Sequence, residues 1–357
     1  MEIMTYQKYI YVGCRTTQKR HAIGKGISVY GINEQGNWDL VDISGNLENP
    51  SFLTLDKSRK FLYAIHGDFG DITAFKILAD GKLEQLNTIT LDAKNPVHVV
   101  VSENNRFLIV PFLTSGDVYT IERDVKSGEL LGVASHKVVA GLKENTVSHP
   151  HQICFDGTQK RIIVPCQGRD AGQSKLVVYD FNEDTGKLIE IFERTTRLKA
   201  EARHAALHPN GKFLYVVSEH DSTIAFYVYD ELKGTMIPIQ ILSTMPDTKT
   251  GDCWASGVAM DNEGKYIYVS NRADNSITWY SINQRTGYLT LIDNVSCLGV
   301  HPRFITLGPA GKHLYIANKN THTICRYTRD GQGNLIEPKL MAETGSPTCV
   351  AFSWIAK

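Results

Sequence analysis

The sequence carries no excess charge of either sign and no long hydrophobic run. Its 357 residues contain 38 Lys and Arg against 38 Asp and Glu, so the formal net charge is zero. This balance argues against a nucleic-acid partner, which would require a basic face. No run of about 18 apolar residues is present, as a membrane helix would need, and the first residues do not resemble a signal peptide. We therefore expect a cytoplasmic protein with neither a nucleic-acid nor a membrane partner.

Several motifs of metal and nucleophile chemistry are also missing. The seven cysteines are scattered without a CxxC pair, which gives no support to a zinc ribbon or a disulfide framework and favours free thiols. There is no GxSxG, no P-loop and no GxGxxG that joins a strand to a helix. A histidine-only zinc site would need several histidines to converge. We therefore expect no metal and no cofactor.

What the sequence does contain is a repeat. A short apolar segment, typified by KFLYV at 212–216, recurs seven times at intervals of about 50 residues. Seven such units account for the whole chain, 1–357, and leave no room for a second domain. The fourth residues of the seven segments are Tyr11, Tyr63, Ile109, Ile163, Tyr215, Tyr268 and Tyr315.

Each unit predicts four strands. A first strand, such as the one in 201–208, is followed by a turn rich in Gly and Asn and then by the recurring segment, which is a hairpin pattern. A third alternating strand comes next, and a Gly-x-Leu step such as 186–188 leads to a fourth. Four strands repeated seven times predict an all-β fold, a single seven-bladed β-propeller.

The two ends of the chain complete one blade. The chain begins with a second-strand segment at 9–12 and ends with a first-strand segment at 346–353. Pairing of these two segments would close the ring and remove an open sheet edge. We therefore predict that the N- and C-terminal strands share a sheet.

Propeller geometry selects the positions at one mouth of the central channel. The start of each first strand and the end of each second strand must lie on the same face of the ring. These fourteen positions hold four Arg, one Lys, one His and one Glu, a set suited to a small anion. They are Ser51, Val97, His151, Arg203, Ser256, Arg303 and Thr348 on the first strands, and Arg15, Gly67, Leu113, Gln167, Glu219, Arg272 and Lys319 after the second strands.

Each of these residues also has a purely structural interpretation. The arginines on the first strands could pair with carboxylates between blades, and His151 could be a structural histidine. Arg15 and Lys319 could be charges at the rim of the channel. Gln167 could have no role beyond a hydrogen bond to a ligand or to the backbone. His98 and His204 fall one residue later along their strands, so strict alternation predicts that they point away from His151 and Arg203.

Several segments together resemble the lactonase family of seven-bladed propellers. This family includes cycloisomerase-type 6-phosphogluconolactonases and the 3-carboxy-cis,cis-muconate lactonising enzyme (carboxymuconate cyclase). The resemblance runs nearly end to end and implies a propeller enzyme. The segments that carry it are YIYVGC (9–14), KGISVYGI (25–32), NPSFLTLDKSRKFLYA (49–64), HPHQICFDG (149–157), ARHAALHPNGKFLYVVSEHDSTIAFY (202–227), YIYVSNRADNSI (266–277) and HPRFITLGPAGKHLYIANKNTHTI (301–324).

The resemblance also implies a catalytic set, namely His151, Arg203, Glu219 and Arg272. The mouth argument adds Arg15, Gln167, Arg303 and Lys319 as substrate-binding residues. The chain departs from the family pattern at Ser218, at 14–17 and at 254–260, and these departures concern the substrate mouth.

The leading hypothesis is a lactonase, a carboxylic-ester hydrolase whose substrate is a small anionic sugar-acid lactone, most plausibly 6-phosphogluconolactone. Arg203 and Arg272 would bind the anion and polarise the carbonyl, and Glu219 or His151 would act as acid or base. One alternative is lactonisation of a carboxymuconate, with Arg15, Arg303 and Lys319 holding additional carboxylates. Another is a non-catalytic scaffold, which predicts an exposed apolar face for a protein partner.

One further expectation concerns Arg203. Its side chain should enter the channel within reach of Glu219, because the two residues belong to antiparallel neighbouring strands of one blade. A mouth position should carry little core packing, so truncation of Arg203 to alanine should leave the fold intact.

Overall fold

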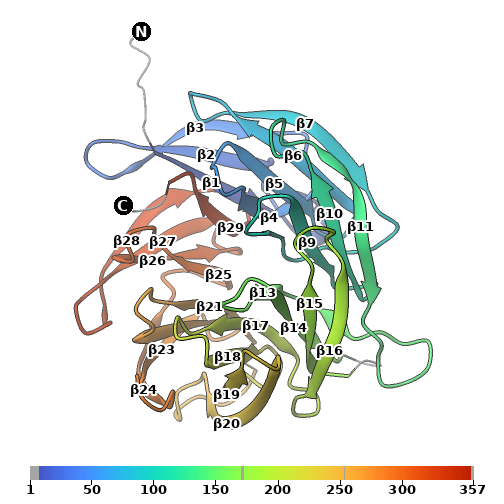
Figure 1. Ribbon diagram of the computed structural model, residues 1–357. Coiled ribbons are helices and arrows are strands. Elements are labelled where there is room, and N and C mark those ends of the chain that lie inside the picture. The colour runs from blue at the N-terminus through green and yellow to red at the C-terminus, as the bar shows by residue number, and fades with distance from the viewer. Residues whose placement is uncertain (1–7, 170–172, 253, 355–357) are drawn as a thin grey trace.

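The computed structural model describes residues 8–169, 173–252 and 254–354, so Cys253 and the first seven residues, which entered the arguments above, lie outside it. Seven antiparallel sheets stand around a central channel (Figure 1), which confirms the seven-bladed propeller. Helical structure in the described part of the chain is limited to one turn, η1 (Gln18–Arg20). No helix among those residues is long and apolar enough to span a membrane.

Every blade has four strand positions, which we call innermost, second, third and outermost in order from the channel. The innermost strands are β4 (Pro50–Leu55), β8 (Val100–Val101), β12 (His149–Pro150) with β13 (Cys154–Phe155), β17 (Ala202–Leu207), β21 (Ala255–Met260), β25 (Pro302–Leu307) and β29 (Pro347–Phe352). The second strands, which carry the recurring segment, are β1 (Tyr9–Cys14), β5 (Phe61–His66), β9 (Phe107–Phe112), β14 (Arg161–Gln167), β18 (Phe213–Ser218), β22 (Tyr266–Asn271) and β26 (His313–Asn318).

The outer half of each blade follows the predicted alternation. The third strands are β2 (Ile27–Ile32), β6 (Asp71–Ile77), β10 (Asp117–Arg123), β15 (Lys175–Phe181), β19 (Thr223–Asp230), β23 (Ser276–Ile282) and β27 (Thr323–Arg329). The outermost strands are β3 (Trp38–Ser44), β7 (Leu83–Thr90), β11 (Leu130–Val138), β16 (Leu188–Thr195), β20 (Thr235–Ser243), β24 (Leu289–Ser296) and β28 (Leu335–Glu343).

The ring closes as the sequence predicts. β29, the last strand, pairs antiparallel with β1, the first, with Val12 opposite Val350. The sheet therefore has the order β29-β1-β2-β3 and holds both ends of the described chain (Figure 1). The C-terminal segment supplies the innermost strand, β29, and the N-terminal segment supplies β1, β2 and β3. Unfolding of either end would therefore disrupt this blade.

Hydrophobic side chains between neighbouring blades form the core. In one cluster, Tyr63 and Ile65 of β5 pack with Leu108 and Val110 of β9, and all four are fully buried. Burial of a side chain of this size contributes about 1.5–3 kcal/mol. Because similar clusters occupy the other blade interfaces, each blade depends on both of its neighbours.

The recurring tyrosines have a specific structural role. The hydroxyl group of Tyr215 donates a hydrogen bond of 2.7 Å to the carbonyl oxygen of Gly287, in the turn between the third and outermost strands of the next blade. Tyr268 makes the same contact, 2.7 Å, with Gly333. Gly287 has a φ of 79°, a left-handed conformation that favours glycine. The tyrosine of one blade is therefore the donor, and the glycine of the Gly-x-Leu step in the next blade the acceptor, of a hydrogen bond between blades.

Two innermost strands are shorter than predicted. The segment 95–102 was expected to form a full strand, but only Val100–Val101 does so, with an isolated bridge from Pro96 to Phe112. The strand expected at 149–156 is interrupted between β12 and β13. At both places the backbone leaves the ladder at the mouth of the channel, where the alternation of side chains is lost.

The other inner strands carry β-bulges at the same mouth. In the pairing of β17 with β18, Ala202 lies opposite Ser218 and His204 lies opposite Val217, so Arg203 is an inserted residue. A bulge locally kinks the strand and redirects its side chains. The register shifts likewise at the other mouth positions, which are Ser51, Ser256, Arg303 and Thr348.

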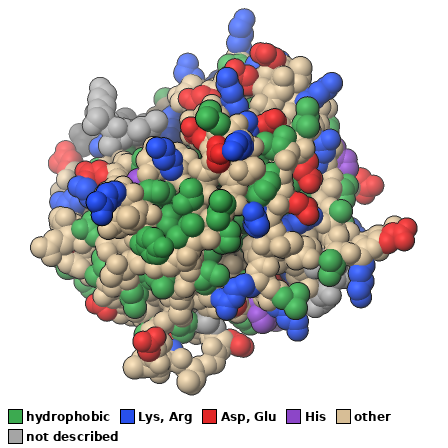
Figure 2. All heavy atoms as spheres, turned by 60° about the horizontal axis from the view of Figure 1, so that its bottom comes forward, with side chains coloured by type: hydrophobic (Ala, Val, Ile, Leu, Met, Phe, Trp, Pro, Cys, Tyr) green, Lys and Arg blue, Asp and Glu red, His purple; other side chains and the backbone are tan. Residues whose placement is uncertain are grey.

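The outermost strands expose part of their hydrophobic side chains. On β20, Ile237 is 61% exposed, and Ile239 and Ile241 are also exposed. Figure 2 turns the bottom of Figure 1, where β18 and β20 lie, toward the viewer, and hydrophobic side chains gather on this face with Lys and Arg side chains around them. The scaffold alternative predicts such a face, and Ile237, Ile239 and Ile241 lie on the outer strand, away from the channel mouth.

Candidate active site

A cavity of about 330 Å³ opens at the mouth selected by the sequence. Six Lys and Arg side chains line it against the single carboxylate of Glu219. Below it lies a second cavity of about 20 Å³, which shares four lining residues with the first. The larger cavity is lined by Arg15, Arg20, Asn95, Val97, Leu113, His151, Arg169, Glu219, Arg272, His301, Arg303 and Lys319.

The structure brings the eight sequence-predicted site residues together. Six of them line the larger cavity, namely Arg15, His151, Glu219, Arg272, Arg303 and Lys319. Arg203 lines the smaller cavity beneath, and Gln167 is fully buried behind Glu219. The eight residues therefore lie at one mouth of the channel, and their catalytic and substrate-binding roles stay predictions.

Glu219 is the centre of the network at this mouth. Its Oε2 atom accepts hydrogen bonds from Nε of Arg203 (2.9 Å) and from Nε2 of Gln167 (2.8 Å). Its Oε1 atom lies 2.7 Å from Nη2 of Arg272 in an ion pair. Both carboxylate oxygens are therefore occupied by side chains of the protein.

These partners fix the charge of Glu219. Burial alone would raise the pKa of this carboxyl, but the guanidinium groups of Arg272 and Arg203 outweigh burial and hold the pKa well below its usual value. Glu219 is therefore ionised at neutral pH, and it is a weak base because its lone pairs already accept hydrogen bonds. Its geometry suits the positioning of two arginines better than proton transfer.

Arg203 is more deeply buried than its place at the mouth suggested. Its side chain is 3% exposed, and besides Glu219 it donates from Nη1 to the carbonyl oxygen of Ser256 in the next blade (2.8 Å). The ion pair with Glu219 confirms the predicted reach. The expectation that Arg203 carries little packing is wrong, because the bulge in β17 turns the side chain down into the channel.

The expectation for His204 is also wrong. Strict alternation predicted that it points away from the site, yet its Nε2 atom lies 3.1 Å from Nη1 of Arg203. The rings of His151 and His204 are 5.1 Å apart, and those of His204 and His98 are 6.2 Å apart. The inserted residue in β17 and the break between β12 and β13 remove the alternation on which the prediction rested.

His151 is a neutral imidazole at the boundary of the two cavities. It is 3% exposed and lines both. Burial lowers its pKa well below the ordinary value, and the nearby charges of Arg203 and Arg303 lower it further. Its Nδ1 atom is buried and makes no hydrogen bond with any part of the chain that the structure describes. An unpartnered ring nitrogen beside a cavity is available to a ligand.

Arg15 is a buried residue of the site, contrary to the interpretation of it as a rim charge. Its Nη1 atom lies 2.9 Å from Oδ2 of Asp68, which also pairs with Arg20. The guanidinium group passes directly over Gly67, where a β-carbon would stand 2.4 Å from Nη1. The glycine at this mouth position therefore makes room for Arg15.

Arg303 is the cation with the least compensation. Its guanidinium group has no hydrogen-bond or ion-pair partner within residues 8–169, 173–252 and 254–354, although its carbonyl oxygen accepts from Ser256, and it lines both cavities. Burial lowers its pKa well below the usual value, as do the charges of Arg15 and Arg203. Lys319 lies higher, where its Nζ atom donates to the carbonyl oxygen of Arg20 (3.3 Å).

Sequence reasoning missed residues that the connecting segments deliver. Arg20 stands in η1, and Arg169 has a φ of 46° and donates from Nε to Oε1 of Gln167 (3.0 Å). The ring of Trp254 lies 5.9 Å from the Arg272 guanidinium. His301 lines the cavity with a pKa that burial and Arg272 lower to about 3. Arg20 and Arg169 lie in connecting segments, whereas Trp254 and His301 each directly precede an innermost strand, so the mouth positions chosen from the repeat did not include them.

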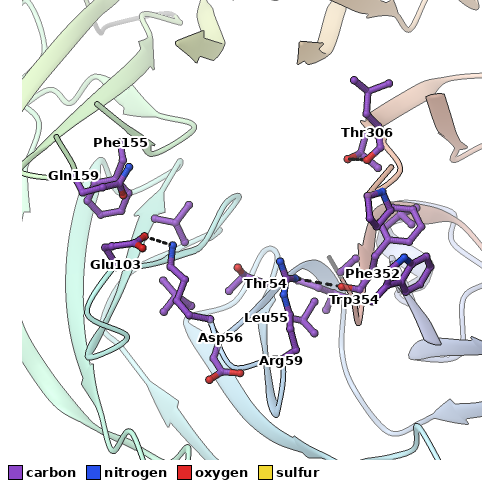
Figure 3. Close-up of a pocket in the computed structure, with 18 residues that line it drawn as sticks. Thr54, Leu55, Asp56, Arg59, Glu103, Phe155, Gln159, Thr306, Phe352 and Trp354 are labelled. Carbon is purple, nitrogen blue, oxygen red and sulfur yellow. Dashed lines mark hydrogen bonds and ion pairs between the residues drawn. The ribbon is translucent and has the colours of Figure 1, made fainter. Parts of the chain in front are cut away.

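A larger cavity of about 690 Å³ lies where the innermost strands end (Figure 3). Its charges are largely paired within the protein: Nζ of Lys57 lies 2.6 Å from Oε2 of Glu103, and Arg59 donates from Nη1 to the carbonyl oxygen of Phe352. Phe155, Phe352 and Trp354 add apolar surface. This opposite mouth therefore lacks the uncompensated positive charge of the candidate site.

Metal ligands do not gather in either cavity. The described ranges contain no group of three or more His, Cys, Asp or Glu side chains that would hold a metal ion. The six cysteines described are all free thiols. What the site offers chemically is a set of fixed guanidinium donors, one engaged carboxylate and neutral imidazoles, which suits an anionic ligand and a developing oxyanion.

The chain is similar in sequence to proteins named 6-phosphogluconolactonase. The chain is 27% identical to the 6-phosphogluconolactonase of Bacillus subtilis (strain 168) over 316 residues, which cover 87% of this chain and 89% of that protein. It is 26% identical to the 6-phosphogluconolactonase of Formosa agariphila, with coverage of 97% and 99%.

Solved structures show the same architecture. A protein from Lactobacillus plantarum superposes with a TM-score of 0.85 at 25% identity, covering 97% of this chain and 99% of that one. The periplasmic gluconolactonase of Pseudomonas aeruginosa superposes with a TM-score of 0.85 at 21% identity, covering 98% and 100%, which shows a shared fold. The sequence model described as Lactonase, 7-bladed beta-propeller matches residues 9–352, and the chain therefore belongs to this lactonase family.

Proposed function

We propose that the protein hydrolyses the lactone of a phosphorylated sugar acid, with 6-phosphogluconolactone as the substrate. The observation that carries the proposal is the 330 Å³ cavity, which has six cationic side chains and a single, fully engaged carboxylate. A phosphate group carries about two negative charges at neutral pH, and planar guanidinium groups bind it through paired hydrogen bonds. The 6-phosphogluconolactonases among the relatives support this choice of substrate.

The arginines have two tasks in this proposal. Cations near the entrance, Arg20 and Lys319, attract and hold the phosphate. Arg203 and Arg303, deeper in the channel, face the lactone carbonyl and stabilise the negative charge that develops on its oxygen when water attacks. Donors that are already oriented and shielded from solvent supply this stabilisation best, and loss of one typically reduces kcat by about 10²–10³.

His151 is the group proposed to move the proton. As water attacks the carbonyl carbon, the neutral imidazole takes a proton from the water and then delivers it to the ring oxygen as the ester bond breaks. Burial, with the nearby arginines, lowers the pKa of His151 and makes it a weak base in the empty site. The oxyanion offsets that positive field, so the imidazolium becomes more favourable at the stage where it forms. Glu219 positions Arg203 and Arg272 in this scheme.

The direct test is a hydrolysis assay on 6-phosphogluconolactone, corrected for spontaneous ring opening, beside the same assay on unphosphorylated gluconolactone. We expect a kcat/KM at least tenfold higher for the phosphorylated lactone, because the entrance cations act on the phosphate. Equal kcat/KM values for the two lactones would contradict a role of the phosphate in recognition. Rates no higher than spontaneous opening for both lactones would contradict lactone hydrolysis.

A second candidate is lactonisation of a carboxymuconate. It is favoured by the number of cations beyond those that one phosphate needs, namely Arg15, Arg303 and Lys319, all of which line the cavity. Here a substrate carboxylate adds to an alkene, and a proton donor replaces the attacking water. A fall in the ultraviolet absorbance of carboxymuconate on mixing with the protein would favour this reaction, and an unchanged spectrum would exclude it.

A further inference from the structure

The small cavity under the substrate cavity has the composition of an anion site. Its volume of about 20 Å³ exceeds the 10–15 Å³ that one water molecule needs and is far too small for a sugar acid. Three arginines line it, with no carboxylate among its ten lining residues. These residues are Arg15, Ser51, Phe52, Val97, His151, Arg203, His204, Arg303, Phe304 and Thr348.

Several donors around this cavity have no partner within the chain. The Arg303 guanidinium makes no hydrogen bond or ion pair, and the Nη2 atom of Arg203 makes none either, among the residues that the structure describes. The ring of His151, whose Nδ1 atom is buried and unpartnered, also borders the cavity. In a well-packed interior such groups are normally satisfied by protein, water or an ion.

The charge balance of the channel points in the same direction. Arg203 and Arg272 share the carboxylate of Glu219, and Arg15 shares that of Asp68 with Arg20. Arg303, which is partly exposed where the two cavities meet, adds a cation without a carboxylate of its own. A charge that has lost much of its water and lacks a counterion is costly, because the protein replaces water incompletely as a solvent. A water molecule in the small cavity would satisfy hydrogen bonds and leave this charge uncompensated.

We infer that the small cavity binds a single monatomic anion, chloride under ordinary conditions, held between Arg303 and Arg203 in the substrate-free protein. The aromatic rings of Phe52 and Phe304 and the side chain of Val97 enclose it on the apolar sides. The small volume favours a monatomic anion over sulfate or phosphate. The anion compensates Arg303 when no substrate is present, and this inference does not rest on which lactone the protein hydrolyses.

The first test uses bromide, which replaces chloride and scatters anomalously. Crystals of the full chain, grown without phosphate or sulfate, are soaked in sodium bromide. We expect an anomalous peak in the small cavity, within hydrogen-bond reach of Arg303 and Arg203. A peak only in the 330 Å³ cavity above would assign the anion to the substrate site and overturn the inference. A water molecule in the small cavity with no anomalous signal would also overturn it.

The second test measures thermal stability in solution. Sodium chloride replaces sodium isethionate, whose anion is too large for the cavity, at constant ionic strength. For a chain of this size, the melting temperature should rise by about 2 °C for each tenfold increase in chloride above its Kd. Arg303→Met should abolish this rise, whereas Arg272→Met should retain it, because Arg272 lines only the upper cavity. If Arg303→Met does not fold, the natural protein still provides a test. A melting temperature that does not change with chloride concentration would overturn the inference.

Discussion

The guanidinium group of Arg203 and the carboxylate of Glu219 lie on adjacent strands of one blade, with Nε of Arg203 2.9 Å from Oε2 of Glu219. Arg203 is the inserted residue of the bulge in β17, and Glu219 follows directly on β18. The bulge directs the arginine into the channel while the carboxylate fixes one side of its guanidinium group. Nη1 donates to the carbonyl oxygen of Ser256, and Nη2 is left without a partner among the described residues, available to a ligand.

Substitution of Arg203 should impair both activity and stability. Arg203→Ala should lower kcat/KM for the lactone by about 10²–10³, and it should lower the free energy of unfolding by about 1–3 kcal/mol, because Glu219 and the Ser256 carbonyl each lose a donor. Arg203→Lys should recover only part of the activity, since an ammonium group lacks the planar fork. Steady-state kinetics and urea unfolding measure the two effects. An Ala variant with unimpaired turnover would contradict the placement of the site.

Glu219 should not set the acid limb of the pH profile. Arg272 and Arg203 lower the pKa of this carboxyl, so it stays ionised above pH 5. Glu219→Gln keeps the shape of the side chain but removes its charge, which leaves Arg203 and Arg272 without a counterion. We expect a large loss of kcat/KM together with an unchanged pH dependence between pH 5 and 7. An acid limb in this range that disappears in the Gln variant would instead show that Glu219 titrates there.

The protein should lose stability as the pH falls below about 6.5. Burial lowers the pKa of His98 to about 3 and that of His301 to about 3, and His151 and His204 also have lowered pKa values. Below pH 6.5 the unfolded chain binds protons at these positions and the folded protein does not, so each histidine contributes about 1 kcal/mol of destabilisation between pH 6.5 and 5.5. Above pH 6.5 both states are neutral and the effect vanishes. Urea unfolding at pH 7.5, 6.5 and 5.5 measures this slope.

His98→Gln supplies a control for the acid effect. It removes one titrating ring from the cluster and should reduce the loss of stability between pH 6.5 and 5.5 by about 1 kcal/mol. A slope equal to that of the natural protein would show that His98 is protonated in the folded state.

Gly67→Ala should displace Arg15 with little cost to the fold. The added β-carbon would stand 2.4 Å from Nη1 of Arg15, the far end of a flexible side chain. We expect KM for the phosphorylated lactone to rise severalfold with a melting temperature close to that of the natural protein. Gly287→Ala is the contrasting case, because its φ of 79° and the ring of Phe226 at 2.3 Å predict a clear fall in melting temperature. A Gly67→Ala variant with unchanged KM would argue against a role of Arg15 in binding.

The bond between Tyr215 and Gly287 should contribute to the cohesion of the blades. Tyr215→Phe keeps the ring and removes the 2.7 Å hydrogen bond to the Gly287 carbonyl. A buried carbonyl without its donor costs about 1–3 kcal/mol. Equilibrium unfolding should show this loss while the kinetic constants stay unchanged, since the residue lies away from the mouth. An unchanged free energy of unfolding would mean that water replaces the tyrosine hydroxyl.

The fold was predictable because the repeat encodes it. Apolar alternation at Tyr215 and its counterparts, together with the turn glycines, specifies four strands per blade, and the terminal segments specify the closure of β1 with β29. The mouth residues followed from the same periodicity, since strand ends fall at equivalent places in every blade.

Local departures from the periodicity were the part that sequence did not predict. The bulge at Arg203 brings His204 to the channel, although alternation placed it on the other side. Asp68 and Arg169 reach the site from left-handed positions with φ of 80° and 46°, which glycine usually occupies and which carry no strand signal. A bulge depends on the pairing of two strands, and a linker conformation depends on its neighbours, so neither is readable from one strand pattern.

The most direct measurement of the central claim compares initial rates of 6-phosphogluconolactone hydrolysis, followed by acid release at constant pH, for the natural protein and for Arg203→Ala at matched folded concentration. The account predicts a rate well above spontaneous opening for the natural protein and a kcat/KM about 10²–10³ lower for the variant. The account would be contradicted if the natural protein did not exceed the spontaneous rate. It would also be contradicted if Arg203→Ala had the same kcat/KM as the natural protein.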